Sequence, residues 1–187
     1  MIEFIHIMAL PFLACLILTG IHAYLGLHVL ERQVIFVDLS LAQIAALGSS
    51  LGLFFGYEMG SSSSYWFSLG FTIIGAGIFA ITRYRKQIIP QEAVIGIVYV
   101  VSAALLVMIL SRSGEGDEHI KEALAGNLLL VSLQEIIKVF LIYSLIGLLP
   151  YIFRKPFLLI SQKPEEAFGK GINVRFWDFL FYISFGF

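Results

Sequence analysis

The chain has 187 residues, of which 59% are hydrophobic and 13% are charged, and its formal net charge is −1. Soluble domains carry about 45–50% apolar and about 25% charged residues, so this composition is typical of a protein embedded in lipid. The near-neutral charge gives no indication of nucleic-acid binding, and the single cysteine, Cys15, excludes an internal disulfide. We therefore expect an all-α, polytopic integral membrane bundle, because helices satisfy their backbone groups within each span.

Apolar segments of spanning length recur along the chain. A transmembrane helix needs about 20 predominantly apolar residues. Five full spans are expected, at residues 4–29, 34–56, 65–82, 91–110 and 132–153. A partial sixth begins near Val174, and its rise of about 21 Å is short of a bilayer core of about 30 Å. Either the single transmembrane domain 1–187 is incomplete at its C-terminus, or neighbouring helices complete this segment.

Basic residues gather in alternate connections between the expected spans. The connections after the first, third and fifth spans contain nine Lys and Arg residues, whereas the opposite connections contain only Arg112 and Lys121. Cytoplasmic loops carry the excess of Lys and Arg. The orientation that follows has the N-terminus outside and the stretch 162–171 in the cytoplasm.

The second span carries polar residues inside its apolar run. A carboxylate at membrane depth costs roughly 2.5–3.5 kcal/mol on insertion scales, so Asp38 is expected to face a polar path or a paired group. Asp38 follows Glu31 by seven residues, which places it only ~10 Å from the cytoplasmic face. Two interpretations stay open: Asp38 lines a translocation path, or it pairs with a donor on a neighbouring helix.

Two further polar residues of this span are read differently. Gln43 lies about 140° around the helix from Asp38, so the two side chains do not share a face. Ser40 is expected to bond its own helix backbone rather than a substrate.

Small residues and histidines in the first two spans indicate packing. Gly48, Gly52 and Gly56 recur every fourth residue, which would let another helix approach closely. His22 and His28 are six residues apart and lie on opposed faces, so we expect structural histidines rather than a shared metal site.

The polar stretch 162–171 predicts a short amphipathic element. Proline is tolerated in a first helical turn, acidic residues suit the positive end of a helix, and glycine ends one. Those positions are filled by Pro164, by Glu165 and Glu166, and by Gly169 and Gly171. Ala167 and Phe168 would then be available to dock into a partner, although a loop helix resting on lipid headgroups explains the pattern equally well.

No catalytic motif accompanies these features. The sequence contains no phosphate-binding loop, no His-Glu-x-x-His and no Gly-x-Ser-x-Gly. The chain is therefore not expected to be an enzyme, and a nucleotide-driven transport step would need a separate subunit.

Taken in order, four segments resemble the permease subunit of metal-ion ABC importers, the family that takes up zinc, manganese or iron. The segments are Asp38 with 42–48 (AQIAALG), 91–97 (QEAVIGI), 124–129 (LAGNLL) and Glu165-x-Ala167-x-x-x-Gly171. Two departures stand out. Gln43 replaces the family's metal-associated histidine at a spacing one residue longer, and family members continue for several more helices.

The resemblance implies a type II ABC importer-like fold in the bacterial cytoplasmic (inner) membrane. It implies a homodimer with a pore at the subunit interface, an extracytoplasmic metal-binding protein and two cytoplasmic ATPase subunits that use ATP. Alternating access would carry a divalent metal ion, guided by Asp38 with Gln43 as a weaker contributor, and no cofactor would be bound covalently. Glu92 is assigned to dipole stabilisation at a helix N-terminus.

The coupling role implied for the stretch 162–171 falls on five residues. They are Glu165, Glu166, Ala167, Phe168 and Gly171. Two other functions remain open: a non-conducting, truncated membrane interaction subunit, and a cation channel or carrier that needs no ATPase.

Overall fold

The computed structural model describes residues 2–58, 60–84, 88–112 and 131–186, with side chains from residue 8 onward. The described part folds into helices: α1 (Ile2–Arg32), α2 (Val37–Phe54), α3 (Ser62–Ile81), α4 (Gln91–Leu110), α6 (Leu133–Ile152), α7 (Arg154–Gln162), α8 (Pro164–Gly169) and α9 (Val174–Ile183). The all-α prediction is confirmed. The segment 124–129 and His119 lie outside the described residues.

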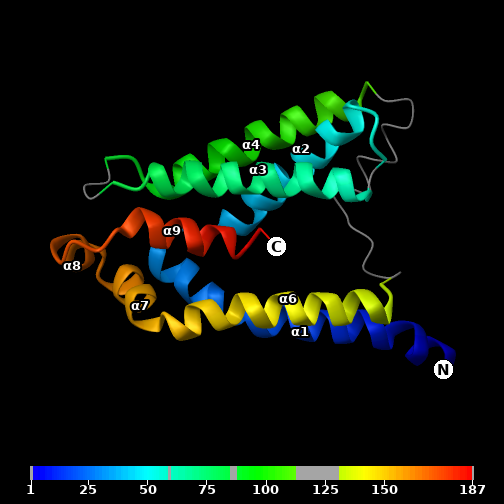
Figure 1. Ribbon diagram of the computed structural model, residues 1–187, viewed down its shortest axis with the longest axis horizontal. Helices are drawn as coiled ribbons and strands as arrows, with labels where there is room; N and C mark the ends of the chain where they lie inside the picture. The colour runs from blue at the N-terminus through cyan, green and yellow to red at the C-terminus, as the bar shows by residue number, and fades with distance from the viewer. Residues whose placement is uncertain (1, 59, 85–87, 113–130, 187) are drawn as a thin grey trace.

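The predicted spans are confirmed within the described residues. Helices α1, α2, α3, α4 and α6 are long and apolar enough to cross a membrane. The sixth segment begins at Val174 as expected and forms the 10-residue helix α9. Each span is separated from the next by a reversal of direction (Figure 1), because polar or glycine-containing connections interrupt the apolar runs.

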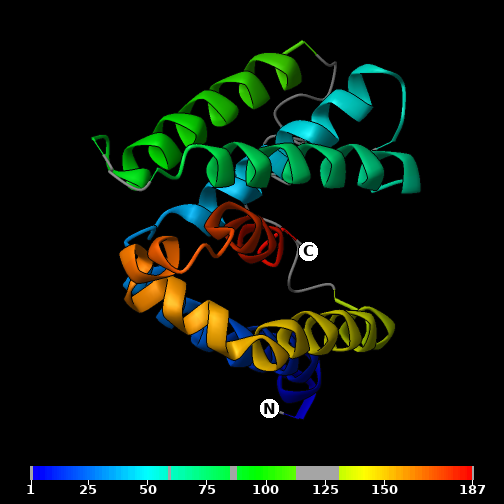
Figure 2. The ribbon, with the colours of Figure 1, turned by 60° about the vertical axis from the view of Figure 1, so that its left-hand side comes forward.

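The helices form two groups with α9 between them. Helices α2, α3 and α4 pack together, α1 pairs with α6, and α9 lies against α3 (Figures 1 and 2). The C-terminal ends of α1, α3 and α6 lie at the same end of the molecule as α7 and α8 (Figure 1). We call this the basic end, and its described Lys and Arg residues are Arg32, Arg83, Arg154, Lys155, Lys163, Lys170 and Arg175.

Two of the three predicted packing glycines bring α2 close to α3. A Cβ atom on Gly48 would lie 2.7 Å from the Phe67 carbonyl oxygen and 2.8 Å from the Phe71 Cβ, and one on Gly52 would lie 3.3 Å from the Ser64 Cα. The partner helix is therefore internal to the chain.

The packing prediction for Gly56 was wrong. Helix α2 ends at Phe54, and Gly56 has a φ of +88° with no atom within 4 Å of a built Cβ. Glycine adopts positive φ at little cost, so Gly56 serves the turn after the helix.

Ser40 also departs from expectation. Its hydroxyl donates to the Ile95 carbonyl oxygen on α4, at 3.2 Å, and its side chain is fully buried. Ser50 follows the expected local pattern and donates to the Leu47 carbonyl oxygen of its own helix, at 2.8 Å. The difference arises because α4 packs against α2 and offers Ser40 a carbonyl on the neighbouring helix.

Candidate functional site

The first candidate site lies at the start of α2. Gln33 has a φ of +56°, which ends α1 and turns the chain into α2. Val34 and Val37, which both follow Gln33, are fully buried and anchor the start of α2. Asp38 is then in the first turn of α2, at the basic end of the molecule.

Asp38 has an exposed side chain. Its Oδ1 accepts a hydrogen bond from the Leu39 N–H at 2.7 Å. Among the described residues Asp38 makes no ion pair. The arrangement within this chain therefore does not match the pairing interpretation, and the positive end of α2 is the nearest stabilising feature.

A second carboxylate reaches the same helix end from α4. The Glu92 Oε1 accepts the Phe36 N–H at 3.0 Å, and Phe36 occupies the N-cap position of α2. Glu92 itself is in the first turn of α4. It therefore lies at the positive ends of two helices, as the prediction of dipole stabilisation requires.

Gln43 lies farther along α2. Its side chain is half-buried, and its Oε1 has no hydrogen-bond partner in the described part of the chain. Within those residues, no group of three His, Cys, Asp or Glu side chains is placed to hold a metal ion. The metal roles of Asp38 and Gln43 stay predictions.

The histidines of α1 have protein partners. His28 is buried, with its Nδ1 2.9 Å from the Ser161 Oγ. The His22 Nδ1 lies 2.9 Å from the Leu18 carbonyl oxygen. Both are structural histidines, as expected.

The second candidate site is the segment α7–α8 at the basic end. Helix α8 begins with Pro164, and Gly171 follows it with a φ of +72°, so the predicted short element is confirmed. The Lys170 ammonium lies 2.7 Å from the Glu166 Oε1, and this hydrogen-bonded pair holds the pKa of Glu166 below its ordinary value. Glu166 is thereby tied to its own helix.

The two apolar residues of α8 differ in their exposure. Ala167 is fully buried with Ile160 and Val174, and Phe168 packs partly against the same cluster. The Ala167 side chain is not available to a partner in this structure, contrary to expectation, because it anchors α8 to α7 and α9. Glu165 is exposed and forms no ion pair within the described residues.

A buried ion cluster, Arg32–Asp178–Arg83, lies beside α7 and α8. The Arg32 Nη1 is 2.5 Å from the Asp178 Oδ1, and the Arg83 Nε is 3.2 Å from the Asp178 Oδ2. The Arg32 Nε also donates to the Ser161 Oγ at 2.9 Å. The cluster joins Arg32 at the end of α1, Arg83 just beyond α3, and Asp178 in the middle of α9.

Sequence reasoning missed this cluster. It treated Arg32 and Arg83 only as loop charges that set orientation. The sequence did contain a signal for the cluster, because Asp178 is a carboxylate inside the apolar run VRFWDFLFYI. Asp38 was singled out for the same kind of pattern. Asp178 is fully buried, so its pairing follows from the rule that buried charges are compensated.

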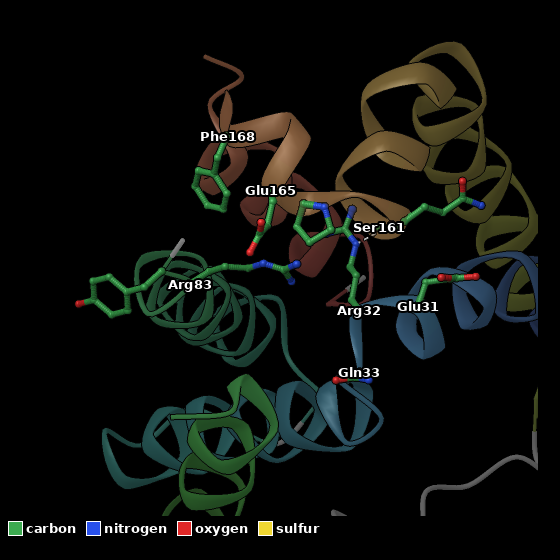
Figure 3. Close-up of a pocket in the computed structure, with 10 residues that line it drawn as sticks. Glu31, Arg32, Gln33, Arg83, Ser161, Glu165 and Phe168 are labelled. Carbon is green, nitrogen blue, oxygen red and sulfur yellow. Dashed lines mark hydrogen bonds between the residues drawn. The ribbon is translucent and has the colours of Figure 1, made fainter. Parts of the chain in front are cut away.

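A cavity of about 330 Å³ adjoins the ion cluster (Figure 3). Its walls include Arg32 and Arg83 from the cluster, Ser161 from α7, and Pro164, Glu165 and Phe168 from α8. The cavity therefore separates α8 from the buried charges that connect α1, α3 and α9.

Comparisons with known proteins place these features in a family. A model of the ABC 3 transport family matches residues 4–186. A chain in the structure of PsaBC from Streptococcus pneumoniae in complex with Fab has a similar fold, with a TM-score of 0.68 and 19% sequence identity. The similarity covers 97% of this chain but 65% of that chain, so this chain spans less than the full length of the protein it resembles. No curated protein matched. Because the family match extends over nearly every residue, this chain belongs to the ABC 3 transport family.

Proposed function

We propose that this chain is the membrane-spanning permease subunit of an ABC importer for divalent metal ions. The observation that carries the proposal is Asp38, an exposed carboxylate in a spanning helix with no ion pair in the described part of the chain. A charged side chain in a span almost always faces a water-filled path or the interior of a bundle. In a single copy Asp38 is exposed in the first turn of α2, at the basic end, and lies outside the interior of the bundle.

The exposure of Asp38 supports a homodimer. Ile35, Phe36 and Leu39 beside it are exposed apolar residues, so this face of the chain is suited to an apolar environment. Lipid against the same face would leave the carboxylate without solvation, whereas a second copy would enclose it in an aqueous path between the subunits.

Oxygen ligands favour hard divalent cations. A carboxylate with an amide oxygen suits ions such as manganese, and zinc prefers imidazole or thiolate. Gln43 does not share a face of α2 with Asp38, so its unpartnered Oε1 would be a weaker and separate contact along the path. Manganese is therefore the first ion to test, with zinc and iron as comparisons.

Energy for transport would come from a partner ATPase. Helix α8 lies at the basic end, which the positive-inside rule places in the cytoplasm. Glu165, Glu166 and Gly169 on α8 and Lys170 just after it are exposed, and Phe168 is half-buried, so such a partner could contact this surface. ATP binding and hydrolysis would then drive alternating access.

The test is reconstitution with the cognate ATPase and metal-binding protein in proteoliposomes. The expected result is accumulation of radiolabelled manganese that requires ATP and stops when a hydrolysis-deficient ATPase is used. Stable association without metal-dependent ATP hydrolysis would support a non-conducting interaction subunit. Flux through the purified chain alone would support a channel or carrier, and either outcome would contradict the proposal.

A further inference from the structure

Resting on the function proposed above, we infer that Glu165 engages the Arg83 guanidinium across the cavity during the transport cycle. In this role Glu165 is a positioning residue: it would link α8 to the ion cluster Arg32–Asp178–Arg83 and would not itself contact the ATPase. The cavity beside α8 would close as the two groups meet.

The ion cluster carries an excess of positive charge. Two guanidinium groups share the Asp178 carboxylate, and the exposed fractions of Arg32 and Arg83 are 5% and 4%. The Arg32 Nη2 and the Arg83 Nη1 have no hydrogen-bond partner among the described residues. Leaving charged donors buried and unpaired costs free energy, so another carboxylate is favoured at this position.

Glu165 is the carboxylate placed to meet that need. It lines the same cavity as Arg83, and Figure 3 shows its carboxylate directed toward the Arg83 guanidinium. Glu31 also lines the cavity, but its carboxylate points away from Arg83 in the same view. Glu166 is paired with Lys170 on α8 itself. Glu165 alone of these three is both unpaired in the described residues and directed at the cluster.

An ion pair here would connect α8, through α3, to α2, the helix that carries Asp38. Ala167 is fully buried against Ile160 and Val174, so α8 is in packing contact with α7 and α9. Arg83 lies two residues beyond the end of α3, and α3 packs on α2 through Gly48 and Gly52. Displacement of α8 would therefore reach α2 through a contiguous set of packed contacts, the kind of connection that energetic coupling requires.

The first test compares Glu165→Gln with the matched control Glu166→Gln in the reconstituted complex. Both residues are exposed and adjacent on α8, and only Glu165 faces the cluster. Loss of a charge-assisted hydrogen bond should lower the number of ions transported per ATP hydrolysed by about tenfold in Glu165→Gln. ATPase binding should be unchanged in both variants, and Glu166→Gln should keep the wild-type ratio.

The second test follows the closure directly. Spin labels at Gly169→Cys on α8 and Ile81→Cys on α3, in a Cys15→Ala background, report the separation of the two helices. Gly169 has open space around a built Cβ, and Ile81 is 62% exposed, so both sites accept a label. ATP should shorten the distance in the otherwise wild-type chain and should leave it unchanged in Glu165→Gln.

Three outcomes would overturn the inference. They are equal transport ratios in the two Gln variants, the same ATP-dependent shortening with and without Glu165, and loss of ATPase binding in Glu165→Gln, which would make Glu165 a docking contact. Failure of the wild-type complex to accumulate manganese with ATP would instead count against the proposed function.

Discussion

Replacing Asp178 with Asn tests the buried ion cluster, because it removes the charge that Arg32 and Arg83 share while keeping the shape of the side chain. Both guanidinium groups would remain buried, with exposed fractions of 5% and 4%. Removing one partner of a buried pair leaves an uncompensated charge and costs about 3–5 kcal/mol. The expected loss is therefore about a hundredfold or more in the folding equilibrium.

The measurement is the free energy of unfolding in mixed micelles, from titration with a denaturing detergent followed by tryptophan fluorescence. Trp177 is adjacent to Asp178 on α9 and reports on this region. The matched control is Asp38→Asn, the same substitution at an exposed carboxylate, which should change the free energy by less than about 1 kcal/mol. Equal effects of the two substitutions would refute the claim that the Asp178 carboxylate stabilises two buried guanidinium groups.

A further variant separates charge from packing. The triple substitution Arg32→Met, Arg83→Met and Asp178→Leu replaces the cluster by apolar side chains. Because no charge is then left unpaired, it should recover most of the stability lost in Asp178→Asn.

Two more predictions use the same titration. Gly48→Ala should destabilise the fold by about 1–3 kcal/mol, because its Cβ would meet backbone and side-chain atoms of α3. Gly70→Ala, with open space at its Cβ, should be neutral or stabilising by up to about 1 kcal/mol; the reverse order would contradict the close approach of α2 and α3. Ser40→Ala should cost about 1 kcal/mol through loss of its bond to Ile95, and Ser50→Ala should cost less because its bond is local; equal losses would remove the interhelical role of Ser40.

The spans could be predicted from the sequence because lipid imposes a length and a composition on each segment. The packing role of Gly48 and Gly52 could also be predicted, because small residues at helical spacing indicate the close approach of another helix. The packing prediction for Gly56 failed because the spacing of the glycines does not show where the helix ends. Two residues beyond Phe54 the chain has already turned.

Side-chain partners were harder to predict than helices. Ser40 was assigned a local bond, but its hydroxyl donates to the Ile95 carbonyl oxygen on α4. Asp178 meets Arg32 across 146 positions of sequence, and no local pattern specifies which distant helices come together. Ala167 was expected at the surface because a short polar segment does not show which of its faces packs on the chain.

Manganese uptake by Asp38→Asn tests most directly whether this carboxylate serves passing cations. The assay compares ATP-driven accumulation in proteoliposomes containing wild-type chain, Asp38→Asn or the charge-conserving Asp38→Glu, at equal levels of membrane insertion and ATPase binding. We expect Asp38→Asn to reduce manganese accumulation at least about tenfold, because an uncharged amide does not attract a divalent ion as a carboxylate does. Asp38→Glu keeps the charge and should retain more of the accumulation. Undiminished accumulation by Asp38→Asn would show that the ion does not pass this residue.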